Sequence, residues 1–396
     1  STMKHLFDKE VDDRSPRDNF FHCLVNAAHQ FHNSANKTER YLLAGYPWFK
    51  CRARDTFISL PGLTLSIDEQ DYFELVMKTA EKGLREFMQN KPLTVKITEI
   101  DQPDVMLWAI WAIQQYAKSA GDEKCISMYG KLISDIICYI IDGKHPNLRL
   151  DTNGLLYANG HDKPITWMNS IVNGKPVVPR SGYIVEFNAL WFNALKFGAK
   201  LANQNNNETK ANQWEDLAES CKQSFVRTFL NDYGYLFDYV DGNMMDWSVR
   251  PNMIFPVAFD YSPLSPEQKK SVLDICTREL LTPKGLRSLS PKSGGYSPVC
   301  SGANRDYSYY QGTAWPWLGG FYMEACLKLY KRTRLSFIER QMVGYEDEMI
   351  INCLGTIPEL FDGNPPFKAR GAISYAMNVA EILRTLNLLE KYSYVK

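Results

Sequence analysis

The chain has 396 residues, of which 45% are hydrophobic and 13% aromatic, so it is long enough and apolar enough to bury a large core. Its 45 Lys and Arg residues balance 45 Asp and Glu residues, which leaves no basic excess to attract nucleic acid or an anionic membrane surface. We see no run of about 18 uncharged apolar residues that would span a bilayer, and no signal-peptide pattern at the start.

The cysteines and histidines argue against a metal or disulfide framework. The nine cysteines are scattered, odd in number and never in C-x-x-C spacing, which is typical of reduced thiols in a cytoplasmic protein. His29 and His32 lie about one helical turn apart, but nothing nearby in the sequence completes a ligand set. We therefore expect no metal and no cofactor.

The dominant pattern is helical. Apolar residues recur at spacings of three and four and predict about twelve helices, over residues 17–33, 55–65, 69–89, 104–119, 123–142, 187–201, 208–230, 251–260, 265–281, 312–331, 335–351 and 371–391. Long connections alternate with short ones, at 90–103, 145–183, 232–250, 282–311 and 354–370.

This alternation predicts an all-α fold, an (α/α)6 barrel with an inner and an outer ring of helices. The long connections would emerge at one end and form the active loops, with small β-hairpins near 155–157 and 233–239. No break in composition marks a second domain, so we expect residues 1–396 to form one domain.

The stretch from Tyr41 to Leu63, YLLAGYPWFKCRARDTFISLPGL, has the composition of a sugar-binding site. Aromatic faces stack on the C–H face of a sugar ring, and a charged pair takes its hydroxyl groups in hydrogen bonds. Here the aromatic residues surround the adjacent pair Arg54 and Asp55. A buried turn with a satisfied ion pair is the alternative. The aromatic residues are Tyr41, Tyr46, Trp48, Phe49 and Phe57.

Three later segments carry further candidates. Glu359 lies in the proline-rich loop 354–370, where a rigidly held carboxylate suits a general base, although a helix-capping or solvent-facing acid fits that loop equally well. Segment 165–195 presents Trp167, Asn169, Arg180 and Glu186, the last of which also fits a first-turn acid favoured by the helix dipole. Segment 285–320 adds Asp306, Tyr309, Gln311, Trp315 and Trp317, of which Trp317 is better explained by core packing.

Taken in order, these motifs resemble the glucosidase half of glycogen debranching enzymes, the inverting amylo-α-1,6-glucosidases that are relatives of the glucoamylases. The resemblance runs from about Tyr41 to Leu383. It rests on AGYPWF, RDTFISLPGL, DVMLWAI, TWMN, VVPR, VEFNALWFNAL, RPN, GLRSLSP, YQGTAWPWLGG and GTIPELFDG. It implies an (α/α)6 barrel that hydrolyses the single α-1,6-linked glucose left at a branch point of glycogen or a related α-glucan.

The same resemblance implies roles for individual residues. Arg54 and Asp55 would hold the glucose in the innermost subsite, and Glu359 would activate water. The residue after Thr-Trp-Met is the general acid, an aspartate in most relatives, but here it is Asn169. An amide cannot deliver a proton, so the two-carboxylate scheme lacks one partner.

Three explanations compete for this departure. Glu186 or Asp104 could serve as the acid, the chain could be a weak enzyme or a glucan-binding remnant, or the acid could belong to another position. We favour the first. Other departures from the family are Cys51, Arg52, Tyr310 and Met377, where relatives often carry Asp, Trp, His and Trp.

We therefore expect one pocket at one end of the barrel, with an α-glucan as the ligand and no nucleic acid or membrane as a partner. The alternatives are a glucoamylase-like α-1,4 exo-glucosidase and a non-catalytic glucan-binding protein. Relatives carry a further N-terminal region, which would make this chain an excised domain. The expected catalytic residues are Glu359, Asn169 and Glu186, and the expected substrate-binding residues are Trp48, Arg54, Asp55, Asp104, Trp167, Arg180, Tyr309, Gln311 and Trp315.

Overall fold

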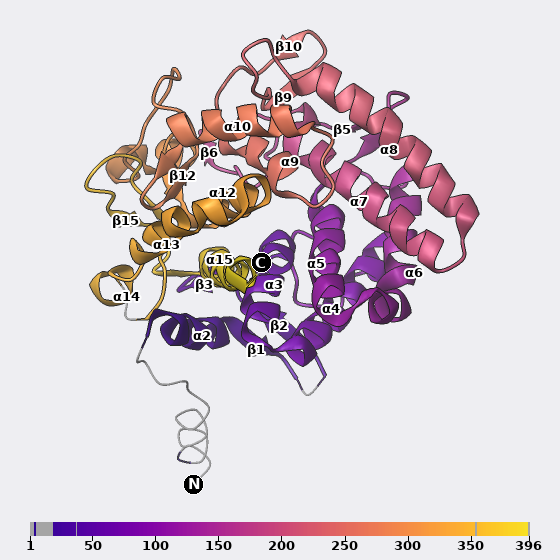
Figure 1. Cartoon of the computed structure of the whole chain (residues 1–396), viewed down its shortest axis with the longest axis horizontal. Coiled ribbons are helices and arrows are strands. Elements are labelled where there is room, and N and C mark those ends of the chain that lie inside the picture. Colours follow the sequence, from indigo (N-terminus) through magenta and orange to yellow (C-terminus); the bar gives the residue numbers. More distant parts are fainter. Residues whose placement is uncertain (1–3, 5–18, 37, 353–354, 395–396) are drawn as a thin grey trace.

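The computed structural model describes residue 4 and residues 19–36, 38–352 and 355–394. Within them, six helices form an inner ring: α3 (Ala53–Leu63), α5 (Val105–Ala120), α7 (Val185–Gln204), α9 (Phe255–Ala258), α12 (Pro316–Tyr330) and α15 (Ala376–Tyr394). Each helix contacts the next, and α15 contacts α3, so the ring is closed. Figure 1 shows these helices around the centre of the molecule.

Six further helices pack outside the ring: α2 (Phe20–Phe31), α4 (Gln70–Met88), α6 (Asp122–Ile141), α8 (Glu208–Phe229), α10 (Pro266–Glu279) and α13 (Leu335–Val343). Shorter helical pieces are η1 (Leu65–Ile67), η2 (Pro251–Ile254), η3 (Gly302–Asn304), α11 (Arg305–Ser308), η4 (Lys331–Arg334) and α14 (Glu348–Ile351). The predicted (α/α)6 barrel is therefore confirmed.

The helices of the two rings differ in how many of their residues are buried. Every residue of the inner helix α3 is buried, whereas the outer helix α8 buries only seven of its 22 residues. A helix that is buried all round must lie inside the protein, and one with a single buried stripe lies at its surface.

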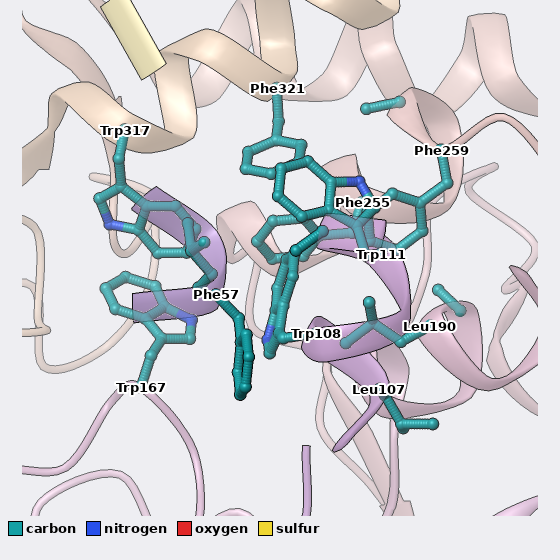
Figure 2. Packing of buried hydrophobic residues seen from close by; sticks show 14 of the residues in the cluster. Phe57, Leu107, Trp108, Trp111, Trp167, Leu190, Phe255, Phe259, Trp317 and Phe321 are labelled. Carbon is teal, nitrogen blue, oxygen red and sulfur yellow. The ribbon is translucent and has the colours of Figure 1, made fainter. Parts of the chain in front are cut away.

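Aromatic side chains fill the centre of the barrel. Trp108 packs edge-on against Trp111 and Phe255, with ring centroids 5.4 Å apart in both pairs. Figure 2 shows this cluster, with Trp317 and Trp167 at its edge. Trp317 is fully buried and packs on Phe255, which agrees with the core role expected for it.

The long connections form two five-stranded antiparallel sheets. One has the order β10-β9-β8-β5-β4 and contains β4 (Arg149–Leu150), β5 (Leu156–Ala158), β8 (Gly182–Ile184), β9 (Tyr239–Asp241) and β10 (Met244–Met245). The other has the order β11-β12-β13-β14-β15 and contains β11 (Leu281–Thr282), β12 (Gly285–Arg287), β13 (Ala314–Trp315), β14 (Leu360–Phe361) and β15 (Ala369–Arg370).

Three two-stranded pairs complete the strands of the described residues: β1 (His32–Ser34) with β2 (Arg40–Leu42), β3 (Gly45–Tyr46) with β16 (Ser374–Tyr375), and β6 (Ile171–Val172) with β7 (Lys175–Pro176). Segments far apart in the sequence are therefore joined, as where Ala314 pairs with Phe361 and Gly45 with Tyr375. The hairpin expected near 155–157 is formed by β4 and β5, and the one expected near 233–239 lies slightly later, where β9 pairs with β10. Strand β8 pairs with both β5 and β9, so the two hairpins belong to one sheet.

The predicted helical ranges agree with the observed helices apart from some ends. In the predicted range 312–331 the helix α12 begins only at Pro316, because Ala314 and Trp315 form strand β13. In the predicted range 371–391 the helix α15 begins only at Ala376, because strand β16 precedes it. The range 251–260 divides into η2 and α9, and the range 335–351 divides into α13 and α14. Residues 17–18 of the first range and residue 354 of the last loop lie outside the described residues. In the part that the structure describes, no helix has both the length and the apolar character to cross a membrane.

Candidate active site

A cavity of about 220 Å³ lies at the N-terminal ends of the inner helices α3, α12 and α15. Five separate parts of the chain form its wall: the loop before α3 together with the first turn of α3, the loop after β5, the segment from α11 to β13, the loop before β14, and the segment from β16 to the start of α15. Eight of the expected site residues line it, namely Trp48, Arg54, Asp55, Trp167, Asn169, Tyr309, Trp315 and Glu359.

Arg54 is held by a buried ion pair. Its Nε and one terminal nitrogen each donate to Asp104 at 2.7 Å, and Asp104 also accepts from the indole N–H of Trp108 at 3.1 Å. Two parallel charge-assisted hydrogen bonds fix the guanidinium plane. Asp104 is therefore the residue that orients Arg54, and it does not line the cavity itself.

Asp55 lies in the first turn of α3, where the partial positive charge of the helix N-terminus favours a carboxylate. Its Oδ1 accepts from Arg52 at 2.8 Å and from the hydroxyl of Tyr375 at 3.2 Å. The guanidinium of Arg52 in turn lies over the ring of Phe49, 4.5 Å from its centroid. The carboxylate is thus fixed at the cavity wall by groups from both ends of the sequence.

Glu359 is 2% exposed, and its two oxygens have separate partners. Oε2 accepts from the backbone N–H of Ala372 at 2.7 Å, and Oε1 accepts from the hydroxyl of Tyr309. Gly371 has a φ of 71°, and a Cβ there would lie 2.3 Å from Oε2, so only glycine allows the backbone to approach this closely. Burial raises the pKa of the Glu359 carboxyl.

Asn378, in the first turn of α15, fixes the loop that carries Glu359. Its amide nitrogen donates to the carbonyls of Pro358 and Glu359 at 2.6 and 2.7 Å, while its Oδ1 accepts from the backbone N–H of Trp317 at 2.9 Å. Asn378 is fully buried. One side chain therefore joins the loop of Glu359 to the starts of α12 and α15.

Asn169 lies among aromatic rings. Its Oδ1 accepts a hydrogen bond of 2.9 Å from the hydroxyl of Tyr310, whose ring stacks on Trp315 with centroids 5.3 Å apart. Trp167 packs edge-on against both rings. This arrangement offers flat apolar faces beside polar groups, which suits an uncharged polyhydroxylated ligand.

Arg180 and Glu186 do not line the cavity, so the expectation that they converge on it is wrong. Glu186, in the first turn of α7, forms a bidentate pair with Arg180, which also bonds Asp238 at 2.6 Å. The guanidinium of Arg180 is thus shared by two carboxylates inside the protein. Asp238 accepts from Asn252, whose Oδ1 accepts from the indole of Trp167 at 2.7 Å. The cluster is therefore linked to the cavity wall through Trp167.

Asp104 and Gln311 also lie outside the cavity lining, contrary to expectation. Asp104 is occupied by Arg54, as described above. Gln311 accepts from Arg250 at 2.8 Å, and Arg250 also donates to the carbonyl of Tyr310 at 2.9 Å. Both side chains support residues of the wall and do not belong to it.

The cavity is also lined by residues that were not among the expected catalytic and substrate-binding residues. Ser170, Arg305 and Tyr375 were not named from the sequence, whereas Phe49, Arg52, Asp306, Tyr310 and Met377 were named only as candidates, neighbours or departures from the family. Arg305 and Asp306 are exposed and belong to the short helix α11, which packs against β6 just after Asn169 and Ser170. In the sequence, only their position close to Tyr309 could have indicated that they line the cavity. Nothing in the sequence around Tyr375 indicated that it would reach Asp55.

A second cluster of polar side chains lies away from the cavity. Glu69 lies beside His29 and His32, which no residue near these histidines in the sequence indicated. Glu69 follows His29 by 40 residues, and only the fold brings it to them.

The comparisons with known proteins agree with this architecture. The glycogen debranching enzyme of Saccharomyces cerevisiae is 24% identical over 388 residues, which cover 72% of this chain and 25% of that protein. The chain thus spans about a quarter of the length of this relative. A bacterial glucoamylase complexed with acarbose has a TM-score of 0.59 at 13% identity, covering 94% of this chain and 55% of the other.

A solved structure named Sialidase has a TM-score of 0.68 at 13% identity, covering 92% of this chain and 33% of the other. At such identities the two structures show a shared fold. Residues 24–384 match the family described as amylo-alpha-1,6-glucosidase. With nearly the whole barrel inside that match, the chain belongs to the amylo-α-1,6-glucosidase family of glycoside hydrolases.

Proposed function

We propose that this chain is a glycoside hydrolase that removes the α-1,6-linked glucose at branch points of glycogen or a related α-glucan, with inversion. The observation that carries the proposal is the joint position of Glu359 with Arg54 and Asp55 in the wall of one cavity. The cavity volume of about 220 Å³ lies below the roughly 300–1,000 Å³ of sites for drug-sized ligands, which suits a single sugar unit.

Glu359 is the proposed general base. A base must hold its carboxylate in one orientation toward the attacking water, and Ala372 and Tyr309 fix both oxygens of Glu359. Burial raises the pKa of Glu359, which makes the carboxylate a better proton acceptor than an exposed glutamate. Arg54 and Asp55 would bind hydroxyl groups of the glucose, with Trp48, Trp167 and Trp315 as its aromatic surroundings.

The proton donor is the open part of the mechanism, because the family's acid position is Asn169. Among the described residues that line the cavity, the carboxylates are Asp55, Asp306 and Glu359. Asp55 is engaged by Arg52 and Tyr375. Asp306 lies on α11, which packs against the strand that follows Asn169. We propose Asp306 as the acid, in place of Glu186 or Asp104.

The direct test is glucose release from glycogen trimmed by phosphorylase, where branch points carry single α-1,6-linked glucose units. We expect release from this substrate and little from maltotetraose, with β-glucose as the first anomer seen by proton NMR. Glu359→Gln should lower the rate by about 10²–10⁴-fold, because it removes the base and keeps the size of the side chain. Faster hydrolysis of maltotetraose would favour an α-1,4 exo-glucosidase.

Asn169 favours one other function, that of a glucan-binding protein without catalysis. An amide donates hydrogen bonds but does not transfer a proton, so the cavity would still hold a sugar. Tight glycogen binding with no glucose release, unchanged by Glu359→Gln, would support this function and contradict the hydrolase.

The substrate of the proposed reaction needs a preceding step, since the outer chain must be transferred away before a single glucose remains at the branch. Three quarters of the yeast relative lies outside the matched region. We propose that the transferase activity belongs to a polypeptide region other than this barrel.

A further inference from the structure

We propose that His29, His32 and Glu69 form a binding site for a divalent transition-metal ion, with zinc as the best match. One ligand atom from each of the three side chains lies within 4.8 Å of the others. Two imidazole nitrogens and one carboxylate oxygen form a ligand set that zinc uses, with a water molecule as the fourth ligand.

The hydrogen bonds of His32 place its lone pair toward Glu69. Its Nε2 lies 3.0 Å from the carbonyl oxygen of Leu63, the last residue of α3. A carbonyl only accepts, so Nε2 carries the proton and Nδ1 carries the lone pair in the neutral ring. Nδ1 lies 3.6 Å from Oε2 of Glu69. A histidine whose other nitrogen donates to a backbone carbonyl is the usual arrangement at metal sites.

His29 completes the set on the other side of the carboxylate. Its Nε2 lies 2.6 Å from Oε1 of Glu69, so a proton is shared along this line. A metal ion would take the place of that proton, since ligating imidazoles are deprotonated at the bound nitrogen. Ligands at about 2.0–2.2 Å from zinc lie roughly 3.4 Å apart in a tetrahedron, which small rotations of these side chains can reach.

Burial at the site is intermediate. The side chains of His29 and Glu69 are 35% and 34% exposed, and that of His32 is 12% exposed. The ring of His32 also stacks on Tyr72, with centroids 3.9 Å apart. An ion could therefore enter from solvent, while His32 is held in a fixed orientation.

The position of the cluster indicates a structural role for the ion. His29 lies on α2, His32 begins β1, and Glu69 directly precedes α4, while the carbonyl of Leu63 belongs to the C-terminal end of α3. The catalytic candidates Arg54 and Asp55 lie at the opposite end of α3. A bound ion would link α2, β1 and the start of α4 near the end of α3 opposite the cavity, and would stabilise the folded state.

The test is titration of chelator-treated protein with Zn²⁺ by calorimetry, and with Co²⁺ by absorbance. We expect one equivalent to bind, with a Co²⁺ spectrum that lacks a thiolate charge-transfer band, and Zn²⁺ should raise the melting temperature. His29→Asn and Glu69→Gln should each weaken binding by more than about 10–100-fold, since even supporting groups contribute that much.

His161→Asn is the matched control. His161 bonds Asp241 at 2.8 Å, a histidine–carboxylate pair that is not part of this cluster, so its loss should leave Zn²⁺ affinity unchanged. Circular dichroism without metal would establish that each variant is folded, and Glu69→Gln keeps the shape of the side chain. No stoichiometric binding, a thiolate band, or equal affinity in wild type and both cluster variants would overturn the proposal.

Discussion

The hydroxyl of Tyr310 donates a 2.9 Å hydrogen bond to Oδ1 of Asn169, and this sets the direction in which the amide points. With its oxygen occupied by Tyr310, the group that Asn169 can present to a ligand is the NH₂ end. That end can hydrogen-bond a glycosidic oxygen but cannot protonate it. The family resemblance implies an aspartate as the acid at this position, so the acid of this chain must be tested separately.

The first prediction concerns that acid. Asp306→Asn should lower glucose release by about 10²–10⁴-fold, because it removes the proposed proton donor. Adding Asn169→Asp to this variant should restore part of the rate, since it supplies a carboxyl where relatives have one. Initial rates on trimmed glycogen are the measurement, with Asp162→Asn, an exposed aspartate outside the cavity lining, as the control.

Full activity in Asp306→Asn would contradict this assignment. If Asn169→Asp alone then raised the rate, the wild type would be an enzyme limited by its amide.

The second prediction concerns pH. Glu359 must be ionised to accept a proton from water, so kcat/KM falls as the pH drops through its pKa. Burial raises that pKa, so the fall should begin above the value of about 4.3 typical of glutamate. Tyr309→Phe removes a hydrogen bond that favours the ionised form, so it should move the acid limb to still higher pH.

Tyr310→Phe is the control for this profile, because its hydroxyl bonds Asn169 and not Glu359. It should leave the acid limb in place. If the acid limb of the kcat/KM profile moved to lower pH in Tyr309→Phe, the hydroxyl of Tyr309 would not favour the ionised form of Glu359.

The third prediction separates structure from catalysis at Glu186. Glu186→Gln should lower the free energy of unfolding by about 3 kcal/mol, because it breaks a buried ion pair. This is the lower end of the usual cost, since Arg180 keeps Asp238 as a partner of opposite charge. Glucose release by the folded variant should stay within a few-fold of wild type. Lys131→Gln, which breaks an exposed pair with Asp135, should cost less than about 1 kcal/mol.

Urea unfolding and initial rates measure the two effects. A rate loss of about 10²-fold in Glu186→Gln without loss of stability would return Glu186 to the list of candidate acids.

The fourth prediction concerns Trp48, which lines the cavity although its side chain is 51% exposed. A ring with one open face can stack on a sugar without supporting the core. Trp48→Ala should raise KM by about 2- to 10-fold with kcat nearly unchanged, which corresponds to about 0.5–1.5 kcal/mol of stacking. Trp247→Ala, at a tryptophan that is 47% exposed and outside the cavity lining, should leave KM unchanged. Equal KM in both variants would exclude stacking on Trp48.

The fold was predictable because helical periodicity and link length are local properties of the sequence. The pairing of the short strands was not, since β13 and β14 meet only after α12 and α13 have turned the chain back. A two-residue strand such as Ala314–Trp315 is too short to show the alternation of apolar and polar residues that predicts a strand. Its pairing with Phe361 depends on how the barrel brings the two segments together.

The site was predictable where a motif carries both the chemistry and the position, as at Arg54, Asp55 and Glu359. Charge alone did not predict whether Glu186, Arg180 and Asp104 line the cavity. These side chains look catalytic in the sequence because they are charged and lie near the motifs, but each forms a buried ion pair, Glu186 with Arg180 and Asp104 with Arg54. Tyr375 shows the converse, since a tyrosine in strand β16, just before α15, reaches Asp55 only through closure of the ring.

That closure has a consequence for the synthesis of the protein. The hydrogen bond between Asp55 and Tyr375 joins residues 320 positions apart, so the wall of the cavity cannot be completed while the ribosome is still making the middle of the chain. At a synthesis rate of about 5–20 residues per second, roughly 15–65 s pass between the synthesis of Asp55 and that of Tyr375. Through that interval α3 lacks α15, so the surface of α3 that α15 covers in the finished barrel stays open to other contacts.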